Sequence, residues 1–153
     1  MYTLKFLMST AVIATCTTAA FATDQPIVGG TTSVTFNETF LGLGLNVSTI
    51  GSATLDGATA TFPITGGTFN TDTSNALIEH DGSGLTLDDT MSFLDLENFL
   101  IDTSVPGITG DVTLDGSLVG NVPLFDLGTG LEVLLTPTAA DVLDATFLGD
   151  SNT

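Results

Sequence analysis

Few types of residue in this chain could catalyse a reaction or bind a metal. Its 153 residues include 18 carboxylates but one histidine, one cysteine and one basic side chain, Lys5. The histidine, His80, lies between two carboxylates in the segment IEHDG, residues 78–82. Catalysis needs a base positioned beside a nucleophile or a substrate proton, and no Gly-x-Ser-x-Gly elbow accompanies this histidine. A carboxylate pair for glycoside hydrolysis stays open, but the sequence favours a protein that is not an enzyme.

Metal ligands are equally sparse. One histidine and one cysteine cannot form the nitrogen and sulfur sets that hold zinc, and no segment matches the twelve-residue calcium loop. Two pairs of nearby carboxylates, Asp88 with Asp89 and Glu79 with Asp81, are candidates for weak calcium binding at the surface. Adjacent carboxylates in a turn are more often simply solvated. Calcium binding at Asp88 and Asp89 is therefore a hypothesis to test.

Residues 1–22 have the three parts of a cleavable export signal. Lys5 supplies a basic start, residues 6–14 are apolar, and the segment AFA at residues 20–22 is a small-x-small cleavage site. We expect Thr23 to begin the mature chain. The sequence therefore predicts an exported protein, located in the periplasm, at the cell surface or outside the cell.

Two further inferences concern this leader. A lipoprotein signal that acylates Cys16 is the alternative to ordinary cleavage, although Thr15 is a poor fit before such a cysteine. The apolar run is shorter than the roughly 20 residues that a membrane-spanning helix needs. We therefore expect no transmembrane segment, and one acidic domain over residues 23–153.

Charge excludes several partners. Loss of Lys5 would change the formal charge from −17 to about −18 and leave no basic side chain. A protein without Lys or Arg cannot displace the counterions of phosphates, so we expect no nucleic-acid binding. Anionic lipid surfaces are disfavoured for the same reason. The carboxylates repel one another and salt weakens that repulsion, so we expect the protein to be more stable in salt.

The mature sequence is typical of an all-β protein, an antiparallel two-sheet sandwich with one short C-terminal helix. Short Thr- and Val-rich segments are separated by Gly and Asp-Gly turns. The dipeptides at residues 56–57 and 115–116 predict hairpins with type I′ turns, which need positive φ. In the strand expected within residues 90–102, strict alternation puts Leu94, Leu96 and Leu100 on one face.

The helix is predicted near the C-terminus. Thr136 is a good N-cap, and Pro137 suits the first helical position. Apolar residues recur at helical spacing beyond it, and Gly149 offers a stop. We expect this helix to cover one open end of the sandwich.

Four segments, in order, resemble the HtaA family of exported haem-binding domains. They are TATFPITGGTFN (59–70), ALIEHDGSGLTL (76–87), LDLENFLID (94–102) and LTPTAADVLDATF (135–147). The resemblance covers most of the mature chain in order and spacing. It implies a two-sheet β domain with a small helix, in which an axial tyrosine and a supporting histidine hold haem.

The resemblance also implies site residues. His80 falls where the family's histidine is expected, and Phe40 falls where the tyrosine is expected. A phenyl ring can stack on a porphyrin but cannot bind iron, so His80 would be the ligand to haem iron. Phe36, Phe40 and Phe62 are the candidate contacts for haem or another flat apolar ligand.

Two classes of function stay open at this point. The first is a non-enzymatic exported binding module for haem or another apolar small molecule. The second is a secreted or cell-surface structural or matrix protein, whose acidic surface responds to calcium and keeps exposed sheet edges from pairing. The sequence identifies no protein partner for either class.

Overall fold

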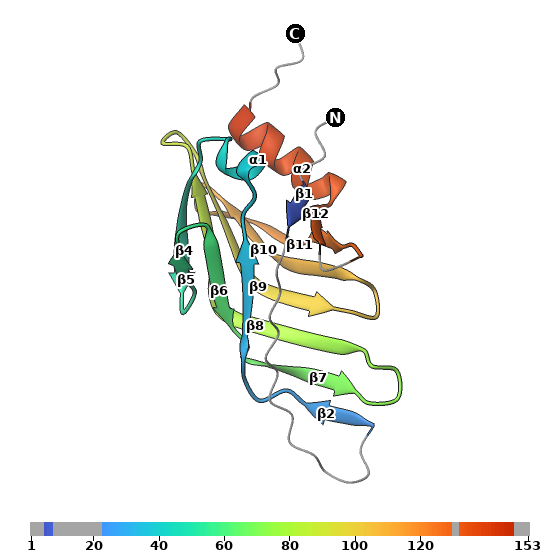
Figure 1. The fold of residues 1–153 in the computed structure, drawn as a ribbon. Helices are drawn as coiled ribbons and strands as arrows, with labels where there is room; N and C mark the ends of the chain where they lie inside the picture. Colours follow the sequence, from blue (N-terminus) through green and yellow to red (C-terminus); the bar gives the residue numbers. More distant parts are fainter. Residues whose placement is uncertain (1–4, 8–22, 130–131, 149–153) are drawn as a thin grey trace.

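The computed structural model describes residues 5–7, 23–129 and 132–148, which form two antiparallel sheets and a short C-terminal helix (Figure 1). The predicted all-β class is thereby confirmed. The expected cleavage site at residues 20–22, Cys16 and the stop at Gly149 lie outside the described residues. In the described parts of the chain, none of the helices combines the length and apolar character needed to cross a bilayer.

The larger sheet has the strand order β1-β12-β11-β10-β9-β8-β7-β2, with β4 also paired to β8. Its strands are β1 (Lys5–Leu7), β2 (Asp24–Pro26), β4 (Asn46–Gly51), β7 (Gly66–Asn70), β8 (Ala76–Asp88), β9 (Phe93–Asp102), β10 (Gly107–Leu114), β11 (Ser117–Leu127) and β12 (Glu132–Leu135). Strand β8 is long enough to pair along one edge with both β7 and β4, while β9 pairs along its other edge. β8 therefore links the part of the sheet that contains β7 and β2 to the part that contains β4.

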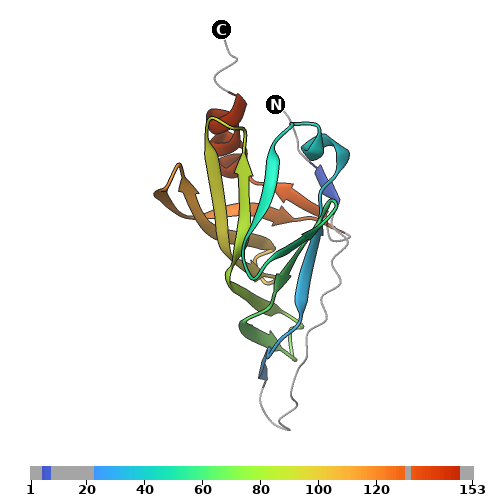
Figure 2. The same cartoon turned by 90° about the vertical axis from the view of Figure 1, so that its left-hand side faces the viewer.

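The smaller sheet has the order β3-β6-β5 and packs against the larger one (Figure 2). Its strands are β3 (Thr31–Thr35), β5 (Thr54–Asp56) and β6 (Thr59–Pro63). Alternation along β3 and β6 directs Thr32 and Phe62, which are cross-strand partners, into the interior. On the opposite face the hydroxyls of Ser33 and Thr61 lie 3.0 Å apart. The core therefore lies between the two sheets.

The two Asp-Gly hairpins form, but with different turns. Asp115 and Gly116 both have positive φ, at 48° and 82°, as a type I′ turn requires. In the first hairpin Asp56 pairs with Thr59, so the central residues are Gly57 and Ala58. Of these two residues Gly57 alone has positive φ. The type I′ prediction is therefore wrong for this hairpin, because pairing begins one residue later than expected.

A bulge in β9 overturns the predicted alternation of that strand. Leu94 and Leu96 are buried as expected, but beyond them Phe99 is buried and Leu100 is only half-buried. Between Leu96 and Phe99, Asn98 has a φ of 54°. At this point the register between β9 and β10 shifts by one residue. An inserted residue moves every later side chain to the other face of a sheet.

Hydrogen bonds explain why the bulge falls at Asn98. Its side-chain oxygen accepts from the backbone N of Gly82 on β8, at 2.9 Å, and its amide nitrogen donates to Asp111 on β10, at 2.9 Å. Asp111 also accepts from the side chain of Asn121 on β11, at 2.9 Å. These bonds join four neighbouring strands on the outer face of the larger sheet.

The predicted C-terminal helix is present as α2 (Pro137–Leu143), which continues into a π-helical turn, η1 (Asp144–Leu148). The Thr136 hydroxyl accepts from the backbone N of Ala139, at 3.1 Å, so the N-cap prediction is confirmed. The apolar side of α2 covers one end of the sandwich, against β11 and β12 (Figure 1). The one-turn helix α1 (Glu38–Leu41), capped by Asn37, was not expected from the sequence.

Candidate functional site

The candidate site is the apolar interior between the two sheets. It contains one cavity of about 40 Å³ beneath α2 and another of about 50 Å³ beside His80. Four side chains line both cavities: Phe36, Leu85, Leu96 and Phe125. The two cavities therefore meet at a common apolar wall in the middle of the domain.

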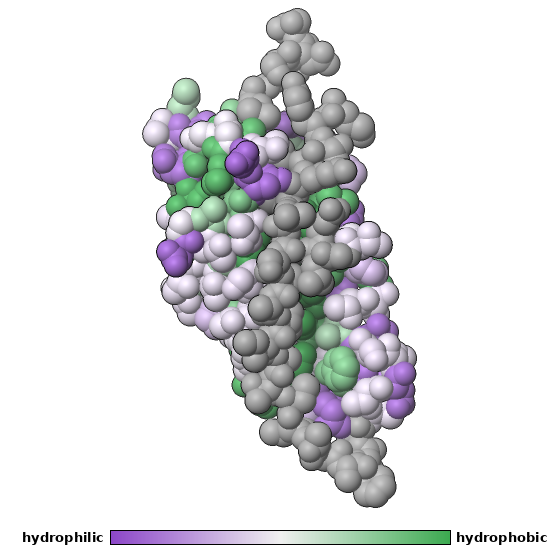
Figure 3. Space-filling view, viewed as in Figure 1, coloured by the Kyte–Doolittle hydropathy of each residue, from purple (hydrophilic) through white to green (hydrophobic). Residues whose placement is uncertain are grey.

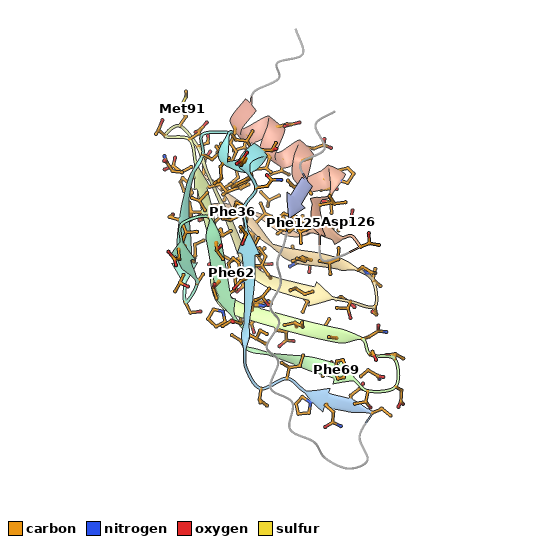
Figure 4. The ribbon with its side chains drawn as sticks, in the orientation of Figure 1. Phe36, Phe62, Phe69, Met91, Phe125 and Asp126 are labelled. Atoms are coloured by element: carbon orange, nitrogen blue, oxygen red, sulfur yellow. The ribbon has the colours of Figure 1, made fainter. Side chains whose placement is uncertain are left out.

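Aromatic rings line both cavities, and Figure 4 labels three of them, Phe36, Phe62 and Phe125. Phe36 directly follows β3, and Phe40 is held over the interior by α1. Their rings stack with centroids 4.8 Å apart. Phe62, on the inner face of β6, meets Phe99 edge-on at 5.1 Å. Such offset and edge-to-face contacts are the favoured geometries of aromatic pairs.

Among the described residues that line the two cavities, His80 is the one with a polar side chain. Its side chain is 1% exposed. Nδ1 lies 3.1 Å from the carbonyl oxygen of Phe99, and Nε2 lies 2.8 Å from the hydroxyl of Thr32. A carbonyl can only accept, so Nδ1 carries the proton, and Nε2 accepts from the hydroxyl. Both ring nitrogens are therefore engaged.

The environment keeps this imidazole neutral. Burial lowers the pKa of His80 below its ordinary value of 6.5, because the charged form loses its hydration. The hydrogen bond to Phe99 and the negative charge of Asp81 act in the opposite direction but are weaker. His80 thus serves as a neutral link between the sheets at neutral pH.

The structure brings four of the predicted site residues together. Phe36, Phe40, Phe62 and His80 are all buried, and each lines at least one of the two cavities. Two of them stack and the other two meet edge-on, with the centroids of Phe62 and His80 6.4 Å apart. Their role as contacts for a ligand stays a prediction.

Asp88 and Asp89 lie elsewhere, at the turn between β8 and β9. Asp88 accepts a hydrogen bond from the backbone N of Thr90. Asp89 accepts from the backbone N of Met91 and Ser92, both at 2.9 Å. These bonds lower the pKa of Asp89, with that from Ser92 the largest cause. Across the described ranges, three or more metal-binding side chains nowhere gather into one group.

Sequence reasoning missed the aliphatic wall and the partner of the histidine. Leu85 and Leu96 carry a usable signal, because each lies in an alternating apolar strand. Thr32 carries none, since it is one of many threonines in the chain and lies 48 residues from His80. Its role depends on the packing of one sheet against the other.

This interior can accept apolar groups of a ligand but provides few hydrogen-bond partners for polar groups. Among the residues described, no buried side-chain nitrogen or oxygen lacks a hydrogen-bond partner. A ligand atom that needs a hydrogen bond would therefore go unpaired, which costs about 1–3 kcal/mol. Dry apolar cavities can bind small hydrocarbons, and about 150 Å³ suffices for benzene. A larger ligand requires the surrounding elements to move apart.

Comparisons with known proteins found no matching family model, no matching curated protein and no matching solved structure.

Proposed function

We propose that this protein is a non-enzymatic, exported binding module that takes an apolar small molecule between its two sheets. The observation that carries the proposal is the meeting of two apolar cavities at Phe36, Leu85, Leu96 and Phe125. A well-packed core has few voids larger than a water molecule. Two adjoining cavities with a continuous apolar lining are the expected feature of a binding site.

Helix α2 is the element best placed to admit a ligand. Its residues Ala139, Val142 and Leu143 line the cavity of about 40 Å³. Val142 and Leu143 are only half-buried, and the outer side of the helix carries Asp141. A short helix held by a small apolar side opens at lower free energy than a central strand. Outward movement of α2 would enlarge the cavity and widen its opening to solvent.

The lining also indicates the chemistry of the ligand. The domain has a formal charge of −17 with Lys5 included, so an anionic ligand is repelled as it approaches. Within the described part of the chain, the buried side-chain nitrogen and oxygen atoms all have hydrogen-bond partners, so a polar ligand atom would find no unpaired group there. A neutral, largely hydrocarbon molecule therefore fits best.

Haem, which the resemblance to HtaA domains implies, does not fit the interior as it is folded here. Cavities of about 40 and 50 Å³ are far smaller than a macrocycle. Nε2 of His80 already accepts from Thr32, so iron binding would leave that hydroxyl without its acceptor. Haem propionates would also find no basic side chain in the exported chain. Haem binding stays a prediction of the resemblance.

Titration with Nile red, a neutral apolar dye, tests the proposal on protein purified after export. Leu96→Phe should weaken dye binding by filling the common wall, and Leu96→Ala should strengthen it by enlarging the space. Leu55→Ala, at an exposed position on β5, is the matched control. Thermal melting of each variant checks that it folds. Equal binding by all folded variants would show that the interior is not the site.

Hemin titration tests the haem prediction separately. A sharpened Soret band at one equivalent that disappears in His80→Ala would support iron ligation by His80. A broad band that His80→Ala leaves unchanged would exclude it. The two titrations distinguish a general apolar site from a haem site.

The second candidate function is that of a secreted structural protein with a calcium-responsive surface. It is favoured by the carboxylates on the outer face of the larger sheet, including Asp95, Glu97 and Asp111. Light scattering during calcium titration tests it. Reversible assembly at millimolar calcium would support this function, and unchanged scattering would contradict it.

A further inference from the structure

Four exposed apolar side chains cluster at the ends of two neighbouring hairpins of the larger sheet. They are Met91, 90% exposed, Phe93, 39%, Leu118, 72%, and Val119, 52%. We name these four residues the tip patch. Figure 4 shows Met91 at the projecting end of the β8–β9 hairpin, and Figure 2 shows that hairpin beside the β10–β11 hairpin.

Backbone pairing places Phe93 and Leu118 on the same face of the larger sheet. Phe93 lies opposite Asp115, because its carbonyl accepts from the Asp115 backbone N at 3.0 Å and its N donates to the Asp115 carboxylate at 2.8 Å. Leu118 pairs with Thr113, two residues before Asp115 on the same strand. The neighbouring inward positions, including Leu94, are buried. Phe93 and Leu118 therefore both face outward from the sheet.

Carboxylates lie close to these apolar side chains. Asp88 is the cross-strand partner of Phe93 on β8, and Asp115 lies opposite Phe93 in the turn that follows β10. Asp95 follows on the same face of β9, and Asp89 lies in the turn beside Met91. Backbone N–H groups hold Asp89 and Asp115 in place. The patch thus combines exposed apolar side chains with carboxylates that lie beside and between them.

We propose that the tip patch binds a basic segment of another protein, one in which apolar side chains alternate with Lys or Arg. A second copy of this chain carries the same charge of −17 and would be repelled. An anionic membrane is repelled likewise. A basic segment is attracted by the carboxylates of the patch, and its apolar side chains can cover the four exposed residues. This inference does not depend on the ligand proposed for the interior.

Figure 3 shows the face of the molecule that carries α1, where apolar surface lies among hydrophilic residues. Exposed apolar residues that occur singly need no explanation, as with Val28 and Val105, which lie in separate loops. A cluster of four at adjacent turns, with carboxylates beside and between them, is instead the pattern of an interaction surface.

Fluorescence anisotropy with a labelled synthetic peptide tests the proposal. The test peptide has twelve residues in which Lys and Leu alternate. The control peptide alternates Lys and Ser, so it has the same charge but lacks the apolar side chains. The double variant Met91→Ser/Leu118→Ser removes apolar area from the patch without touching a carboxylate. Val28→Ser/Val105→Ser is the matched control, since both valines are exposed outside the patch.

We expect the Lys/Leu peptide to bind about tenfold more weakly to the patch variant, because two partly buried apolar side chains contribute at least this much. The control variant should bind as the parent does, and the Lys/Ser peptide should bind weakly to all three proteins. Equal affinity of all three proteins for the Lys/Leu peptide would overturn the proposal, since charge alone would then explain binding. Concentration-dependent dimers that the patch variant abolishes would overturn it in favour of self-association.

Discussion

The hydroxyl of Thr32 donates to Nε2 of His80 across the boundary between the two sheets, with 2.8 Å between the atoms. Both residues are almost fully buried, at 2% and 1% exposed. The other ring nitrogen donates to the carbonyl of Phe99. This chain of bonds joins β3 of the smaller sheet to β8 and β9 of the larger one inside an otherwise apolar core.

Thr32→Val should destabilise the protein by about 1–3 kcal/mol, because it leaves a buried imidazole nitrogen without its donor. Thr35→Val is the matched control, since Thr35 bonds to Thr59 at 3.0 Å on the outer, partly exposed face. Urea unfolding followed by circular dichroism measures both. A loss for Thr32→Val no larger than that for Thr35→Val would contradict a structural role for the buried bond.

Stability should fall as pH decreases below about 6.5, the ordinary pKa of histidine. The pKa of His80 is lower in the folded protein, so the unfolded chain takes up the proton first. The contribution of His80 is therefore complete above pH 6.5 and is lost as pH falls toward the folded pKa. Unfolding free energies of the parent and His80→Gln at pH 7.5 and 5.5 measure this difference, which should shrink at the lower pH.

Carboxylates with lowered pKa values titrate in a separate range. Hydrogen bonds hold the pKa of Asp102, chiefly through Ser104, and that of Asp111, chiefly through Asn98, below the ordinary 3.8. Their stabilising contributions are present above pH 3.8 and are lost below it.

If His80→Gln lost as much stability as the parent between pH 7.5 and 5.5, a group other than His80 would have to be responsible for the loss in that range.

Gly84→Ala should cost about 1–3 kcal/mol through overpacking. A Cβ at this position would lie 2.2 Å from the backbone oxygen of Leu96, where β8 and β9 approach closely. Gly29→Ala is the control, because a Cβ there meets nothing within 4 Å. Thermal melting of the two variants compares them. A Gly84→Ala protein as stable as Gly29→Ala would show that the two strands can separate at no cost.

The melting temperature should rise by several degrees between 10 and 500 mM NaCl. The chain has 18 carboxylates and one basic residue, so repulsion among exposed charges opposes the compact state. Salt shortens the Debye length from about 30 Å at 10 mM and weakens that repulsion. Differential scanning calorimetry gives the result. A flat profile would mean that these carboxylates do not destabilise the fold.

Local signals in the sequence determined much of this fold. The Asp115-Gly116 turn, the Thr136 N-cap and the apolar side of α2 each depend on a few adjacent residues, and the structure has all three. The alternation of Leu94 and Leu96 likewise places them in the core. Backbone preference and side-chain period act over short distances, so they can be read from the sequence.

Tertiary structure alone decided the rest. The bulge at Asn98 depends on partners in β8 and β10, and it reverses which residues of β9 face the core. The bond between Thr32 and His80 joins residues 48 positions apart, and nothing near Thr32 distinguishes it from other threonines. Such features are set by which strands become neighbours and in what register. Packing of the whole chain selects these, so the apolar interior could be expected from the sequence but its shape could not.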